Sequence, residues 1–526
     1  MKKHASTLHG PRLLIPSLGA RMIRSWMPAL FLASAVLARA DVSLPKVIDS
    51  KMVLQRDKAV PIWGWADPGE EVTVEFAGQV KKATPDATGK WMLKLDPMPA
   101  SAESRTMTVK GKNQIKLDDV LVGEVWLASG QSNMQLTFFE INPAEWAEAQ
   151  TQKDNRLVRA LHVNRVVAAF PMHDVSGKWK DCAEMVAQPN SVSAAAFFFS
   201  VKLQKELGVP VAFIDCPWGG QRIECFIPDE GYKAAGLPIP QRGNLPDAKV
   251  AEAALKSAAN ELLAAADAAA KGRWVGFSGP PAFFGQTQNG IWNAMISPVA
   301  PYAIRGAIWY QGESNWGATD YFQKLKALSA GWSQMFQVKD IPILQVQIAP
   351  NTMNGRAQPN STVLADTIWA AQYRGSQEIP GMGIVAIQDT GIEPTNIHPR
   401  NKKPVGERLA DLALKTQYGK DVVTRGPSFA SAKRSGAKVV VGFRDIDQGL
   451  VTYDGKAPSW FELSADGNEF VAAEAAIVGD TVEVSAQNVP EPKFVRMGWR
   501  DVGLPNLKDK NGWPVFVFAS QPVPAP

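Results

Sequence analysis

Cysteine is scarce in this sequence, and the scarcity limits the chemistry open to the protein. Only Cys182, Cys216 and Cys225 occur among 526 residues, too few for the disulfide framework of a small secreted scaffold. No C-x-x-C spacing suggests a zinc site, and we expect neither a metal nor an organic cofactor. Two of the cysteines could pair in an oxidising compartment, but the sequence leaves that pairing and the alternative of free buried thiols open.

Acidic residues are absent from residues 1–40, which carry six basic ones. Those six exceed the formal net charge of +5 of the whole chain, so the remainder has no basic excess. A basic excess is what would argue for a nucleic acid or an anionic membrane as partner. We therefore expect neither partner for the mature protein, and the sequence leaves the oligomeric state open.

Residues 1–40 predict a signal peptide. Arg21 and Arg24 precede the apolar run Trp26–Leu37, which is too short to span a bilayer as a helix. Ala38-Arg39-Ala40 then matches a cleavage motif, so we expect cleavage before Asp41 and a secreted or periplasmic protein. An uncleaved anchor is the alternative, and the true start codon, Met1 or Met22, is not fixed.

The remaining residues fall into three regions by hydrophobic pattern. Residues 41–120 contain short alternating runs between turn signals, which indicate a β-sandwich. In residues 121–418 short apolar runs alternate with helical patterns, which predicts an α/β fold with a doubly wound parallel sheet. Within it, the alanine-rich segment 247–271 predicts an inserted helix. Residues 425–526 again show β patterns. They form either a second β-rich domain or the remainder of the first.

Polar clusters follow four of the apolar runs expected to be strands of that sheet. Because ligands bind outside the carboxyl ends of parallel strands, we expect the clusters to meet at one edge. They comprise Gly130-Gln131-Ser132-Asn133-Met134, Cys216-Pro217-Trp218-Gly219-Gly220, Gln311-Gly312-Glu313-Ser314-Asn315, and Asp389 with Asn396-Ile397-His398-Pro399.

Ser132 and His398 are the candidate nucleophile and general base. Ser132 follows a buried strand and a glycine, where a serine hydroxyl can emerge at a tight turn, although an N-cap serine also suits this position. Outside residues 1–40 the only histidines are His162, His173 and His398. His162 lies in a strand-like run and His173 in a loop without a polar cluster, which favours His398 as the base.

The other clustered residues supply candidate donors and substrate contacts. The Ser132 N–H, a backbone N–H at Gly219 or Gly220 and the Gln311 carboxamide could stabilise an oxyanion, although a Gly-Gly pair also suits a plain turn. Glu313 could orient its neighbours or bind substrate. Gln131, Asn133 and Trp218 are further candidates for substrate contact.

These motifs resemble the sialate O-acetylesterase family, a branch of the serine esterases named for Ser, Gly, Asn and His. The similar segments are VWLASGQSNMQ (125–135), IWNAMISPVAPYAIRGAIWYQGESN (291–315) and IHPRNKKPVGERLA (397–410), with MVLQRDKAVPIWGWADPGEEVTVEFAG (52–78) resembling a preceding β-domain. The resemblance covers essentially all of the chain after residue 40. It implies a flavodoxin-like three-layer catalytic domain, Ser132 as nucleophile, His398 as base, and oxyanion donors at Ser132, Gly219 or Gly220, and Gln311.

The acid of a catalytic triad is the open point in this resemblance. The wider superfamily often has Asp three residues before the histidine, where this chain has Thr395. Asp389 is our first candidate and Glu393 the second. A backbone carbonyl near Asn396 could instead hold the histidine tautomer, which would leave a Ser–His dyad.

The sequence therefore predicts a secreted esterase that removes O-acetyl groups from a carbohydrate, most simply a sialic acid, through an acyl-enzyme. The natural glycan and the acetyl position are not readable. Cys216 and Gln221 replace the small hydroxyl residues expected beside Trp-Gly-Gly, which bears on specificity. An acetyl-xylan or other polysaccharide esterase is the first alternative, and a non-catalytic carbohydrate-binding protein is the second.

Overall fold

The computed structural model describes residues 41–239 and 288–525, apart from positions 169, 354, 356 and 359. The expected signal peptide at 1–40 and the expected inserted helix at 247–271 lie outside these residues, so both stay predictions. Within the described part of the chain, no helix combines the length and the apolar character that a membrane crossing needs.

Residues 41–113 form strands that pair antiparallel, as their alternating pattern predicts, except β1, which pairs parallel with β7. Burial alternates along β3, with Val72, Val74 and Phe76 buried, because successive side chains point to opposite faces of a strand. The strands are β1 (Val53–Gln55), β2 (Val60–Trp65), β3 (Val72–Phe76), β4 (Gln79–Ala83), β5 (Lys90–Leu95) and β6 (Ser101–Lys110).

Strand β7 (Gln114–Gly130) belongs to this β region and to the central sheet at once. Its first half pairs antiparallel with β6, and its second half, Glu124–Gly130, pairs parallel with β10 (Val211–Pro217). The boundary expected at residues 120/121 thus lies inside one continuous strand. Because β7 is hydrogen-bonded on both sides of that point, the N-terminal strands and the central sheet share one hydrophobic core.

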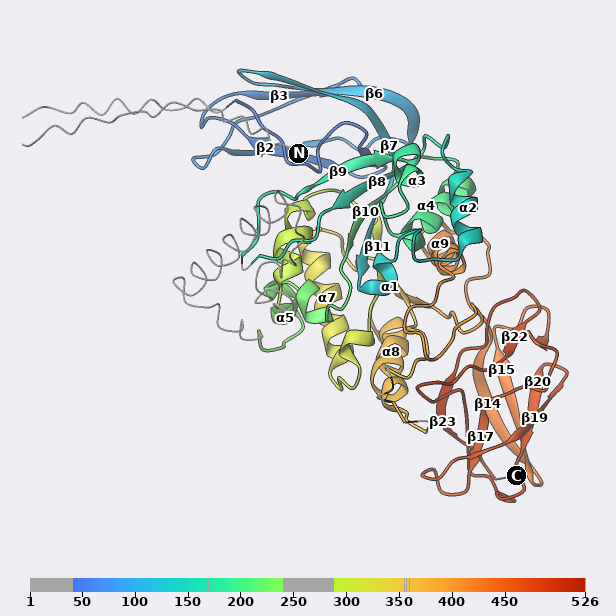
Figure 1. The fold of residues 1–526 in the computed structure, drawn as a ribbon. Coiled ribbons are helices and arrows are strands. Elements are labelled where there is room, and N and C mark those ends of the chain that lie inside the picture. The colour runs from blue at the N-terminus through green and yellow to red at the C-terminus, as the bar shows by residue number, and fades with distance from the viewer. Residues whose placement is uncertain are drawn as a thin grey trace, which may run out of the picture. The chain divides into compact units, whose positions relative to one another are not determined.

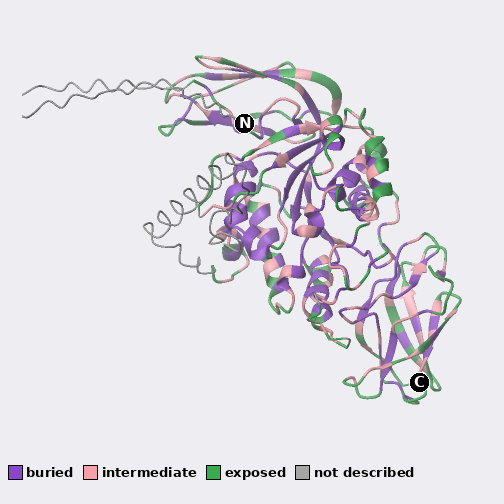
Figure 2. Cartoon of the chain, in the orientation of Figure 1, coloured by how far each residue is buried: buried purple, intermediate pink, exposed green. Residues whose placement is uncertain are grey.

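The central sheet has the strand order β13-β12-β11-β7-β10-β8-β9. Every neighbouring pair is parallel except β8 and β9, so the sheet is mixed, with an antiparallel strand at one edge. Its inner strands are buried on both faces because helices lie on both sides (Figures 1 and 2). The strands not yet defined are β8 (Val158–Val163), β9 (Gly177–Asp181), β11 (Gly306–Tyr310), β12 (Ile343–Val346) and β13 (Met382–Val385).

The sequence has helical patterns at residues 193–207, 321–336, 362–377 and 404–416, and helices are present at all four, with shifts of a few residues at their ends. Helices α4 and α9 pack against each other, and α7 packs against α5 and α8. The helices and single turns are α1 (Ser132–Gln135), α2 (Pro143–Gln150), α3 (Cys182–Ala187), α4 (Ala194–Leu207), η1 (Ile223–Phe226), α5 (Asp229–Ala234), η3 (Trp292–Ile296), η4 (Ser297–Val299), η5 (Glu313–Asn315), α7 (Tyr321–Met335), η6 (Ala365–Trp369), α8 (Ala370–Glu378) and α9 (Lys403–Tyr418).

Residues 428–522 form a separate β region with its own core, including Val441, Leu463 and Val495. Buried Asp501 ties it to the central region by accepting hydrogen bonds from Ser361 Oγ at 2.5 Å and Leu364 N at 2.7 Å. Its strands are β14 (Ser428–Ser435), β15 (Lys438–Arg444), β16 (Leu450–Thr452), β17 (Phe461–Ser464), β18 (Val471–Ala472), β19 (Glu474–Val478), β20 (Thr481–Ser485), β21 (Phe494–Met497), β22 (Leu507–Asp509) and β23 (Phe518–Pro522).

Candidate active site

The turn that presents Ser132 depends on Gly130. This residue ends β7 with φ of +136°, and a Cβ there would lie 2.2 Å from the carbonyl oxygen of Tyr310 on β11. Only glycine allows this close approach of two backbones. The chain then turns sharply, and Ser132 begins α1, so its own N–H is not used by the hydrogen bonds of that helix.

His398 meets Ser132 across the edge of the sheet. Its Nε2 lies 2.8 Å from Ser132 Oγ, a hydrogen-bonding distance between a nucleophile and a base. The backbone N–H of His398 donates to Asn396 Oδ1 at 2.9 Å, which holds the loop before α9. Burial and the positive charge of Lys402 lower the pKa of His398, while Glu140 acts in the opposite direction. The lowered pKa favours the neutral imidazole that a general base requires.

Asp389, our first candidate for the acid, has a different partner. Its two oxygens accept hydrogen bonds from Nη1 and Nη2 of Arg408, each at 2.7 Å, so the pair joins the end of β13 to α9. No hydrogen bond joins Asp389 to His398 in the described part of the chain. Glu393 does not hydrogen-bond to His398 either. Among the described residues, no hydrogen bond to Nδ1 of His398 occurs. In this structure Asp389 therefore braces α9 rather than orienting His398, and its role as the acid stays a prediction.

Two of the expected oxyanion donors are engaged elsewhere in this structure. The Gly219 N–H donates to Gln135 Oε1 at 2.6 Å, although a Cβ on Gly219 would lie 3.3 Å from Ser132 Cβ, which places this backbone beside the nucleophile. The Gln311 side chain is fully buried. Its nitrogen faces Asn315 Oδ1 at 2.7 Å, Gln131 Oε1 at 3.1 Å and the Gln221 carbonyl at 3.2 Å.

The two N–H groups of Gln311 are therefore satisfied within the protein, and its side chain braces the loop after β11 rather than reaching Ser132. An oxyanion could use the Ser132 N–H at once, whereas the Gly219 N–H becomes available only when the Gln135 side chain moves. Gly220 is exposed, with a left-handed φ of +71° that suits glycine.

Three residues expected to contact substrate are buried. Gln131 is 2% exposed, and its Oε1 accepts hydrogen bonds from the loop 311–315. Asn133 and Glu313 are 0% and 3% exposed, and Asn133 Nδ2 donates to Glu313 Oε1 at 2.5 Å. These three side chains support the serine turn from within the protein and are not placed to touch a sugar. Trp218 is partly buried and packs against the core, so its contact with substrate stays a prediction.

Sequence reasoning missed Lys402, which is fully buried beside this cluster. Its Nζ donates to Asn133 Oδ1 at 2.8 Å. A signal was present in the sequence, because Lys402 and Lys403 stand at the start of α9, where the helix dipole disfavours positive charge. A lysine at that position therefore indicates a role other than stabilising the helix.

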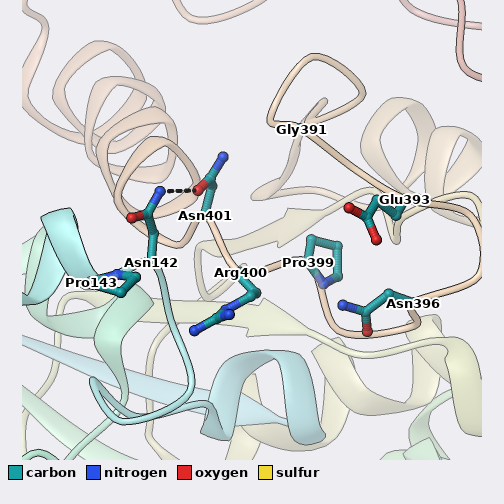
Figure 3. A pocket seen from close by; sticks show the side chains of 8 residues that line it. All are labelled: Asn142, Pro143, Gly391, Glu393, Asn396, Pro399, Arg400 and Asn401. Carbon is teal, nitrogen blue, oxygen red and sulfur yellow. Dashed lines mark hydrogen bonds between the residues drawn. The ribbon is translucent and has the colours of Figure 1, made fainter.

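A polar cavity of about 510 Å³ opens beside the histidine loop (Figure 3). Arg400, Glu393, Asn396 and Asn401 line it from that loop, and Asn142 faces them from the start of α2. Asn142 donates to Asn401 Oδ1 at 3.2 Å across the cavity. Amides and charged groups at this density suit a ligand rich in hydroxyl groups.

Neither a metal-binding cluster nor a disulfide is found in the described part of the chain. No three His, Cys, Asp or Glu side chains within it gather closely enough to hold a metal ion. The three cysteines are buried and unpaired. Burial raises the pKa of Cys182 and of Cys225 to about 12, so both behave as inert thiols at neutral pH.

Comparisons with known proteins indicate a family of carbohydrate esterases. The family model described as "Carbohydrate esterase, sialic acid-specific acetylesterase" matches residues 272–415. A sialate O-acetylesterase of Rattus norvegicus is 32% identical over 414 residues, covering 72% of this chain and 74% of that protein. The Homo sapiens sialate O-acetylesterase is 29% identical over 415 residues, covering 72% of each.

The chain is also similar to a solved structure. A carbohydrate acetylesterase from Xanthomonas citri aligns with a TM-score of 0.75 and 29% identity. The alignment covers 91% of this chain and 99% of that one, so the similarity extends beyond the central sheet to the flanking β regions.

Proposed function

The chain belongs to the sialate O-acetylesterase family and is a carboxylic ester hydrolase, and on that premise we propose that it removes O-acetyl groups from sugars through an acyl-enzyme on Ser132. The observation that carries the proposal is the 2.8 Å contact between Ser132 Oγ and His398 Nε2. We also propose that the central sheet is doubly wound and of the three-layer type of the Ser-Gly-Asn-His esterases. The strand order around β7 supports this proposal.

The reaction has two steps. His398 takes the proton of Ser132 as Oγ attacks the acetyl carbonyl, and the negative charge on the carbonyl oxygen is met by the Ser132 N–H and by the Gly219 N–H once Gln135 releases it. The tetrahedral intermediate collapses, His398 returns the proton to the departing sugar oxygen, and the acetyl group stays on Ser132. Water, deprotonated by His398, then attacks the acetyl-enzyme, and His398 returns that proton to Ser132 Oγ as acetate is released, which restores free Ser132.

The substrate we favour is an O-acetylated sialic acid, because the curated relatives carry that activity in their names. The cavity of Figure 3 supports this choice, since Arg400 could meet a sugar carboxylate there. The second candidate is a neutral acetylated polysaccharide such as acetyl-xylan. It is favoured by the Xanthomonas citri structure, which is named only as a carbohydrate acetylesterase.

Acetate release from purified protein decides between the two substrates. Hydrolysis of 9-O-acetylated sialic acid but not of acetyl-xylan supports the first candidate, and the reverse result overturns it. Arg400→Gln should lower kcat/KM for the sialate about tenfold or more, because a charged hydrogen bond contributes about 1.5–3 kcal/mol. Arg400→Gln should leave kcat/KM for a neutral acetyl ester unchanged. Arg374→Gln, in an exposed pair with Glu378 on α8, is the matched control.

The alternative of a non-catalytic carbohydrate-binding protein is not supported, because the chain belongs to a family of esterases. It predicts sugar binding without turnover of p-nitrophenyl acetate. Wild-type turnover that is lost in Ser132→Ala and His398→Ala would exclude it, whereas equal rates in all three proteins would show that the site is misplaced.

The proposal also includes export of the protein. It is supported by the basic, apolar and Ala-x-Ala segments of residues 1–40. N-terminal sequencing of protein recovered from the periplasm or the medium should start at Asp41. Recovery of the full-length chain in a membrane fraction would instead favour an uncleaved anchor.

A further inference from the structure

Lys402 is buried without the partner that a buried lysine usually has. Its residue exposure is 0%, yet no carboxylate of the described residues lies within ion-pair distance of its Nζ. Instead Nζ donates to the neutral amide oxygen of Asn133 and lies 5.1 Å from the ring centroid of Tyr310. Burying a charge without a counter-charge costs several kcal/mol, so a stabilising role alone does not explain this lysine.

The contact with Lys402 determines which way the Asn133 amide faces. An ammonium group can only donate hydrogen bonds, so the atom facing it must be the amide oxygen. The amide nitrogen then donates to Glu313 Oε1 at 2.5 Å and to the carbonyl oxygen of Ile397 at 3.0 Å. Both N–H groups and the oxygen of Asn133 are thus satisfied by groups from three separate segments.

Two of the segments that meet at Asn133 carry the reacting side chains. Asn133 directly follows Ser132, and Ile397 directly precedes His398. The hydrogen bond between Asn133 and Ile397 therefore joins the serine turn to the histidine loop, one residue away from each reacting group. Glu313 anchors the amide from the other side, and its second oxygen, Oε2, is buried without a hydrogen-bond partner.

We propose that Lys402 is a positioning residue for the Ser132–His398 pair, because it fixes the Asn133 amide that joins the two catalytic segments. The inference rests on the proposed esterase function for its kinetic consequences. It also makes a statement about His398 that holds whether or not the protein turns over an ester.

The charges around the site agree with this role. Burial and, to a smaller extent, the charge of Lys402 lower the pKa of His398, whereas Glu140 raises it. Burial lowers the pKa of Lys402 itself to about 7, while Glu313, Glu145 and Glu140 raise it. Lys402 is thus charged in the acidic range where His398 titrates, which is where its charge affects the proton affinity of the imidazole.

Two substitutions separate the hydrogen bond from the charge. Lys402→Met removes both at similar volume, whereas Lys402→Gln keeps an N–H donor and removes the charge. Lys403→Met is the matched control, because the neighbouring lysine is 30% exposed and pairs with Glu148 and Glu407 instead. The measurements are the pKa of His398 by NMR of a ¹³C-histidine-labelled protein, assigned with His398→Ala, and the pH profile of p-nitrophenyl acetate hydrolysis.

We expect the pKa of His398, and with it the rising limb of kcat/KM against pH, to move upward in both Lys402 variants. The kcat of Lys402→Met should fall by up to about a hundredfold, because small misplacements of reacting groups have costs of that order. Lys402→Gln should retain more of the rate, and Lys403→Met should match the wild type. A lysine that serves only stability would lower the melting temperature without moving the pKa.

Three results would overturn the inference. The first is a His398 pKa in Lys402→Met equal to that of the wild type and of Lys403→Met. The second is an unchanged pH profile and kcat in that variant. The third result applies if neither Lys402 variant folds, and it is a pKa of His398 in the wild type at or above 6.5. Absence of Ser132-dependent hydrolysis in the wild type would instead refute the proposed function, and the NMR titration would still decide the role of Lys402.

Discussion

Asp389→Asn tests whether the esterase works without a triad acid at this position. In the structure both Asp389 oxygens are bound to Arg408, with the two side chains 15% and 11% exposed. Removing one partner of a buried ion pair costs about 3–5 kcal/mol, and partial exposure puts this pair near the lower end, at about 3 kcal/mol. We therefore expect a clear loss of unfolding free energy in urea.

The same substitution should leave the chemistry nearly intact. Where an aspartate orients a catalytic histidine, its replacement by asparagine lowers kcat about 10⁴-fold because the wrong tautomer results. Here we expect kcat for p-nitrophenyl acetate to stay within about tenfold of the wild type, measured where the variant is fully folded. A 10⁴-fold loss of kcat with unchanged stability would refute the reasoning and return Asp389 to the role of acid. Glu393→Gln, on the exposed side of the same loop, is the comparison variant.

Three further predictions follow from the site. Since burial and Lys402 lower the pKa of His398, kcat/KM should rise with pH and reach half of its plateau below pH 6.5; a midpoint above 6.5 contradicts this assignment. Gly219→Ala should lower kcat about a hundredfold, because the added Cβ lies 3.3 Å from Ser132 Cβ and disturbs an oxyanion donor; a wild-type rate would exclude this glycine from the oxyanion site. Gly130→Ala should yield little folded protein, judged by soluble yield and circular dichroism, because its Cβ would lie 2.2 Å from the Tyr310 carbonyl.

The elements of the central sheet could be predicted because periodicity is local. The apolar run at 307–310 and the helical repeat at 193–207 match β11 and α4 within one residue at each end, whereas the run at 210–214 ends three residues before β10 does. The strand β7 was harder, because its two halves pair in different sheet environments, and nothing in one segment shows which strands will lie beside it. The expected boundary at 120/121 lies inside it for that reason.

The serine and the histidine were predictable because few residues of the right type stood after strands. It was not predictable which neighbouring residues face the ligand, because that depends on the direction of each side chain. Asn133 follows Ser132 directly, yet it points into the protein towards Lys402 and Glu313. The partner of Asp389 was also hidden, since Arg408 lies 19 residues later, on α9.

The central claim is that an acetyl group passes through Ser132. Rapid mixing of the mature protein with p-nitrophenyl acetate, acid quenching and peptide mass spectrometry would detect that intermediate directly. The account predicts one acetyl group on the peptide containing Ser132, formed as fast as p-nitrophenol is released and absent from His398→Ala. Steady turnover without acetyl on that peptide, or acetyl on another residue at a kinetically competent rate, would contradict it.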